Sequence, residues 1–173
     1  DETLNAFRVA DGSIRMVAGN GGEGPCSFAG DSLLTLKRDC ATGPVIRSRN
    51  DYSGPGDYPH NQWLPATYAM EDGHGVTVHG LVHDEFHAGD SRQHPRVPAL
   101  LCARNVTNAC WYSSVISVRS SDSGRSFSRV VTTDRPNGVA IAAPIAYRAD
   151  AGVQGTPAHR HIVRSPVDDY FYV

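Results

Sequence analysis

The sequence lacks several features that would place it in a common functional class. No apolar run reaches the roughly 18 residues that a membrane-spanning helix needs. With 16 basic and 18 acidic residues the formal charge is only −2, so nothing in the composition favours nucleic acid or an anionic membrane as a partner. Cys-x-x-Cys, Gly-x-Ser-x-Gly and phosphate-loop motifs are missing as well. Their absence argues against a zinc ribbon, a nucleophile-elbow hydrolase and a P-loop nucleotide site.

Helical periodicity is scarce, whereas turn-forming residues are abundant. The chain holds 17 glycines and 11 prolines among 173 residues, and its apolar share of 40% is enough to build a core. Runs rich in β-branched and aromatic residues occur at 76–86, 111–118 and 127–133. Only residues 33–36 form a short apolar run that suits a helical turn. We therefore predict an all-β chain of short strands joined by turns.

A strand, an acidic tight turn and a second strand recur three times along the chain. The turns are Asp11-Gly12, Asp72-Gly73 and Asp168-Asp169. Two further strands follow the second unit, which predicts a four-stranded antiparallel meander of the kind found in propeller blades. We expect one blade at about 4–50, a second at about 62–135 and the start of a third at about 140–173. Since propellers close with at least four blades, a second chain or a C-terminal continuation would complete the domain.

Residues 120–127 read Ser-Ser-Asp-Ser-Gly-Arg-Ser-Phe and fit the Asp-box, Ser-x-Asp-x-Gly-x-Ser/Thr-Phe/Trp. In such a turn Asp122 accepts hydrogen bonds from backbone N–H groups, and Gly124 takes a positive φ. Phe127 is expected to point back into the blade. The motif is typical of sialidase-like blades, where it marks the fold at the rim and not the catalytic centre. The alternative is a generic Ser/Gly turn.

Four cysteines form two local pairs in the sequence. We predict disulfides between Cys26 and Cys40 and between Cys102 and Cys110, because short loops close most easily. Four buried free thiols are the alternative. A glycosylation sequon begins at Asn105, between the second pair. Together these features predict a secreted, extracellular protein.

Several short segments follow one another in a recognisable order. They are residues 6–8, 37–40, 81–86, 110–112, the Asp-box and 162–165. In this order they resemble the first half of secreted sialidase-like β-propeller proteins, which are similar to five-bladed furanosidase- and xylosidase-type glycoside hydrolases. The resemblance implies a five-bladed propeller whose site lies at the central axis and is lined by the first strands of the blades. It also implies three carboxylates there, one of them in the half of the propeller beyond this chain.

The densest polar cluster lies around His83, Asp84 and Glu85, at the end of a predicted strand. Alternation along a strand places His83 and Glu85 on one face and Asp84 on the other. We predict Glu85 as a glycosidase acid or base with His83 beside it, and Asp84 belongs to the same candidate catalytic set. A second carboxylate would have to flank the sugar bond, from Asp51, Asp57 or a residue outside the chain. The alternative is a polar strand end whose His and Glu satisfy each other.

Three further residues are candidates for substrate binding. Trp63 offers an aromatic platform for a sugar face, Arg8 a bidentate partner for a carboxylate, and His161 a polar group where the third blade begins. Trp63 as core or lid and His161 as part of a surface loop are the alternatives. True sialidase activity is disfavoured, because such enzymes need three arginines and only Arg8 stands out.

Metal binding is not predicted. His83 and His87 have a helical ligand spacing within a segment that reads as strand. A calcium ion at the axis, near His83 or His161, is the alternative to a site without any cofactor.

The predicted function is glycan processing or glycan binding in an axial cleft, with carbohydrate as the partner. Two alternatives stay open. One is a non-catalytic structural or adhesion module that assembles with a second chain, and the other is an enzyme assembled only with that chain.

Overall fold

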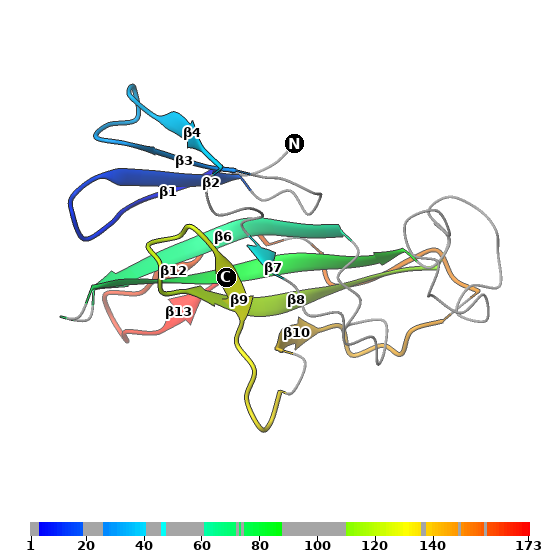
Figure 1. Cartoon of the computed structure of the whole chain (residues 1–173). Coiled ribbons are helices and arrows are strands. Elements are labelled where there is room, and N and C mark those ends of the chain that lie inside the picture. The colour runs from blue at the N-terminus through cyan, green and yellow to red at the C-terminus, as the bar shows by residue number, and fades with distance from the viewer. Residues whose placement is uncertain are drawn as a thin grey trace.

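The computed structural model describes residues 4–18, 26–40, 46–47, 61–71, 73, 75–87, 110–135, 138–148, 150–157 and 159–173. All regular elements in these ranges are β-strands (Figure 1), which confirms the all-β prediction. Residues 33–36 form a turn there and not a helix. The described part of the chain accordingly has no helix with the length and hydrophobicity to cross a membrane.

The first sheet is a four-stranded antiparallel meander with the order β1-β2-β3-β4. Its strands are β1 (Leu4–Arg8), β2 (Ile14–Ala18), β3 (Ser27–Gly30) and β4 (Lys37–Asp39). Each strand is followed directly by its neighbour in the sheet, as in a propeller blade.

The second sheet contains the longest strands of the molecule. β6 (Asn61–Glu71), β7 (Val76–His87), β8 (Trp111–Ser120) and β9 (Phe127–Arg129) form a second antiparallel meander. The register is continuous between β7 and β8 and shifts once between β6 and β7, after Trp63. The predicted strand at 127–133 is shorter in the structure and ends at Arg129.

Three shorter strands also belong to this second sheet and pair with β8 or β9. β5 (Ile46–Arg47) pairs in parallel with β9, so this segment belongs to the second sheet, although its place in the sequence suggests the first blade. β10 (Val139–Ala142) runs antiparallel to β8, and β11 (Val153–Gly155) runs parallel to it. The three sheets do not close into a ring, so the described residues establish the all-β class and not a five-bladed propeller.

A separate hairpin comes last in the chain. β12 (Val163–Arg164) pairs antiparallel with β13 (Phe171–Tyr172). Its turn resembles the β1–β2 turn, because an aspartate accepts a backbone N–H two residues on in both. The N–H of Ser13 donates to Asp11 at 2.9 Å, and that of Tyr170 donates to Asp168 at 3.1 Å. The recurring acidic turn therefore has a shared physical basis at its first and third occurrences.

The core lies between the first two sheets. Alternation along β7 and β8 turns one face of the second sheet toward the first sheet, which lies above it in Figure 1. The cluster of buried side chains there comprises Val17, Leu64, Val78, Val82, Ile116, Val118 and Phe127. The opposite face of the second sheet carries the β12–β13 hairpin, since Phe171 packs edge-on against Tyr68 with ring centroids 5.0 Å apart. The second sheet is therefore the middle layer of the molecule.

The β8–β9 turn has the hydrogen bonds that the Asp-box predicts. Asp122 accepts the Ser126 N–H at 2.8 Å and the Ser126 hydroxyl at 2.6 Å. Gly124 has a φ of 77°, and Phe127 is fully buried. A Cβ on Gly124 would lie 2.3 Å from Cζ of Phe7, so this turn also packs against the first sheet.

The β3–β4 turn has the same backbone hydrogen bond as the Asp-box turn but lacks its sequence motif, so the sequence did not predict it. The N–H of Thr35 donates to the Ser32 carbonyl at 3.1 Å, just as that of Arg125 donates to Asp122 at 3.4 Å. Ser32 and Thr35 also hold the turn through their side chains, and a contact of 3.1 Å joins their hydroxyls. The two meanders thus share their last connection, which extends the internal repeat.

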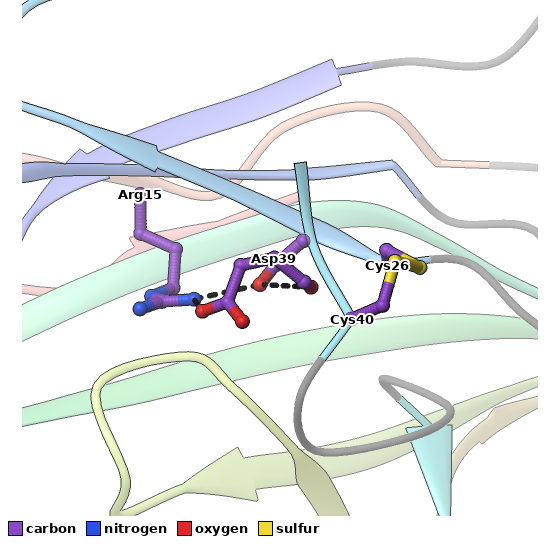
Figure 2. The surroundings of a disulfide bond; sticks show 5 residues. Arg15, Cys26, Asp39 and Cys40 are labelled. Carbon is purple, nitrogen blue, oxygen red and sulfur yellow. Dashed lines mark hydrogen bonds and ion pairs between the residues drawn. A yellow bond between two sulfur atoms is a disulfide. The ribbon is translucent and has the colours of Figure 1, made fainter. Parts of the chain in front are cut away.

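The predicted Cys26–Cys40 disulfide is confirmed, and it ties the start of β3 to the end of β4. Figure 2 shows that Arg15 and Asp39 approach each other beside this bond. The Arg15 guanidinium, which is buried, donates to the Ser27 hydroxyl at 2.6 Å and to the Asp39 carboxylate at 3.0 Å. A covalent bond and a partly buried ion pair therefore stabilise the same end of the first sheet.

Some predictions fall on residues outside the described ranges. Cys102, Asn105, Asp51 and Asp57 are among them, so the second disulfide, the sequon and the two partner carboxylates stay predictions. Cys110 itself is disulfide-bonded and fully buried.

Candidate functional site

The candidate site lies on the face of the second sheet that points away from the first sheet. His83 and Glu85 share this face because they are two residues apart on β7, whereas Asp84 points to the opposite face, as predicted. The strand register places Trp63 of β6 directly beside His83 and Val115 of β8 on its other side. The site is therefore built on β7 and its two neighbours in the middle layer, β6 and β8.

His83 and Glu85 form a largely buried pair. Nδ1 of His83 lies 3.5 Å from Oε1 of Glu85, and the two side chains are only 10% and 12% exposed. Burial lowers the pKa of His83 below its usual value of 6.5, although the Glu85 carboxylate and the Thr156 backbone oppose the shift. The imidazole is therefore neutral at neutral pH, next to a carboxyl group with which it can exchange a proton.

His159 joins this pair from the segment that follows β11. Its Nε2 lies 3.0 Å from the Leu81 carbonyl oxygen on β7. Burial lowers the pKa of His159; the Leu81 carbonyl opposes that shift and the nearby His83 adds to it. His161, which we predicted for this role, is exposed. The structure therefore brings His159 to the candidate site in place of His161.

Three buried ring nitrogens at this site make no hydrogen bond with any part of the chain that the structure describes. They are Nε1 of Trp63, Nε2 of His83 and Nδ1 of His159. Buried polar atoms in folded proteins nearly always have a partner. These three gather at His83, which lies beside the Glu85 carboxylate, next to Trp63 in the strand register and close to His159. Such a cluster is suited to a ligand whose groups both donate and accept hydrogen bonds.

Asp84 has a different environment from Glu85. Its carboxylate is buried on the core face and lies 3.6 Å from Nη2 of Arg129, whose side chain is 10% exposed. Arg129 was not predicted, yet it lies two residues after Phe127 on β9 and therefore on the same, buried face. Charged side chains are rarely buried unless they are paired, so an arginine on the buried face of a strand is the signal that could have found this pair. Asp84 thus acts in a structural ion pair.

Arg8 lies away from this cluster. It is exposed at the end of β1, where its guanidinium donates to the Gly12 carbonyl at 2.8 Å. The structure therefore does not bring Arg8 to Trp63 or to the His83–Glu85 pair. Instead, Arg8 stabilises the β1–β2 turn.

No group of three or more metal-ligating side chains occurs within the described ranges. Comparison of the chain with protein-family models, curated proteins and solved structures found no match.

Proposed function

We propose that this chain is part of a secreted sialidase-like β-propeller that binds and processes glycans, with its site centred on His83 and Glu85. The buried ring nitrogens of Trp63, His83 and His159, together with the Glu85 carboxyl group beside His83, carry this proposal. Saccharide hydroxyls both donate and accept hydrogen bonds and so match such a mixture of donors and acceptors. The two blade-like meanders and the Asp-box turn support the propeller assignment.

In this proposal Glu85 is the proton donor or acceptor and His83 controls its protonation. Glycosidases use a pair of carboxyl groups, and Asp84 is unsuited as the second because it points to the other face and pairs with Arg129. The second carboxyl group would come from the rest of the propeller. Trp63, across the strand pair from His83, would stack on the sugar ring.

A screen of aryl glycosides followed by glycan-binding measurements tests this function. On any substrate that is turned over, Glu85→Gln should lower kcat by about a hundredfold or more and leave binding intact. Trp63→Ala should weaken binding instead. Glu71→Gln is the matched control, since Glu71 is exposed on β6 of the same sheet. Unchanged turnover of the Glu85→Gln protein on a confirmed substrate would reject the assignment.

An adhesion or structural module that assembles with a second chain is the second candidate. The observation that favours it is the apolar surface of the β12–β13 hairpin, where Val167 is 91% exposed and Tyr170 69%. Large exposed apolar side chains in a group mark interaction surfaces. Sedimentation velocity over a range of concentrations tests this candidate, which predicts self-association or capture of the remaining propeller. A monomer at all concentrations that shows no affinity for that part would reject it.

A further inference from the structure

A cavity on the second sheet, away from the candidate site, has a polar lining. It has a volume of about 400 Å³ and lies over the Asp-box turn and the strands that flank it. Its lining includes Arg119, Ser121, Asp122, Ser126, Ser128 and Arg129. Cavities that hold small ligands have volumes of roughly 300–1,000 Å³, so this one has room for a monosaccharide or a small anion.

The charges around this cavity are balanced except at one residue. Asp122 accepts three hydrogen bonds, from the Ser126 N–H and from the hydroxyls of Ser126 and Ser120. The Arg129 charge is neutralised by the Asp84 carboxylate, with which it forms an ion pair on the core face. Arg119, which is exposed on β8, makes no hydrogen bond or ion pair with any residue that the structure describes. One positive charge is therefore available to a ligand.

The strand register places hydroxyl groups beside this charge. Arg119 lies directly opposite Ser128 in the β8–β9 pair, so the two side chains share a face. Ser121 follows at the start of the turn. A guanidinium fork flanked by hydroxyl donors matches the oxygen atoms of a sulfate, phosphate or carboxylate group.

We infer that this cavity is a binding site for an oxyanion, either free or carried by a saccharide, with Arg119 as its anchor and Ser121 and Ser128 as further donors. The site is separate from the His83–Glu85 pair. His79, the β7 neighbour of Arg119, is six residues from Glu85, or about 20 Å along an extended strand. The inference therefore does not depend on the glycan-processing role of that pair.

Isothermal titration of the full chain with galactose 6-sulfate, sodium sulfate and galactose, at one ionic strength, tests the site. Galactose 6-sulfate should bind, and Arg119→Ala should weaken that binding about tenfold or more, since hydrogen bonds to charged groups contribute this much. Ser128→Ala should weaken it less. Arg125→Ala is the matched control, because Arg125 belongs to the same turn but does not line the cavity.

A second readout comes from His79. Burial lowers the pKa of His79, and the neighbouring Arg119 charge lowers it further. An anion bound to Arg119 should therefore raise the His79 pKa in an NMR titration, and Arg119→Ala should abolish the effect of the anion. Equal binding of sodium sulfate would support the site and identify the free ion as its ligand. No binding, equal binding of galactose, or equal losses in Arg119→Ala and Arg125→Ala would overturn the inference.

Discussion

Gly124 provides the sharpest test of how the two meanders pack. It has a φ of 77°, which is in the left-handed region, and a Cβ there would lie 2.3 Å from Cζ and 2.8 Å from Cε2 of Phe7 on β1. Replacing it with alanine therefore has two costs. The left-handed backbone costs about 1–2 kcal/mol, and moving the Phe7 ring costs about 1–3 kcal/mol as overpacking.

We expect Gly124→Ala to lower the free energy of unfolding by roughly 2–5 kcal/mol. Gly12→Ala isolates the backbone term, because Gly12 has a φ of 84° and a Cβ added there would meet no atom within 4 Å. That control should lose only about 1–2 kcal/mol. Urea unfolding followed by tryptophan fluorescence gives both values.

A double-mutant cycle with Phe7→Ala separates the packing term from the backbone term. In the Phe7→Ala background the Gly124 substitution should cost only the backbone term, which leaves a coupling energy of about 1–3 kcal/mol. Equal losses in Gly124→Ala and Gly12→Ala, or a coupling energy near zero, would refute the packing of the Asp-box turn against the first sheet.

Three further predictions concern stability. Replacing Cys26 and Cys40 with serine should cost about 3 kcal/mol in urea unfolding, because the bond closes a loop of 14 residues. Since burial lowers the folded-state pKa values of His83 and His159, the stability they provide is present above pH 6.5 and lost as the pH falls through those lowered values. Thermal unfolding between pH 7.5 and 5 should show this decline, with a smaller slope in His159→Gln; an unchanged slope would contradict it. Burial opposes ionisation of Asp122, but hydrogen bonds from Ser126 and Ser120 outweigh it and lower the Asp122 pKa. Asp122→Asn should therefore cost about 1 kcal/mol at pH 7 and much less at pH 2–3, as urea unfolding at the two pH values would show.

Local signals in the sequence predicted much of the fold. β7 and β8 lie where β-branched and aromatic residues cluster, and the Asp-box has the geometry that its residue types require. The Cys26–Cys40 bond followed from its short loop. Each of these features depends on residues that are close in the sequence, which is why the sequence alone was sufficient.

Contacts between segments that are far apart in the chain could not be predicted from the sequence. The parallel addition of β5 to β9 and of β11 to β8 joins segments that carry no matching motif. The contact of His159 with the Leu81 carbonyl spans 78 residues, so only the structure distinguishes His159 from His161. Arg129 was missed for a related reason, since its partner Asp84 lies 45 residues away in the chain.

The structure separates two carboxylates that the sequence presents as one cluster. Asp84 and Glu85 are consecutive, yet strand alternation turns Asp84 toward the core and Glu85 toward the face that carries His159. A buried carboxylate that pairs with a buried arginine is costly to disturb. A carboxyl group beside a neutral imidazole is instead suited to proton transfer. If the chain performs acid–base chemistry on β7, Glu85 is the residue that can do it, and substitution of Asp84 should lower stability before it affects any reaction.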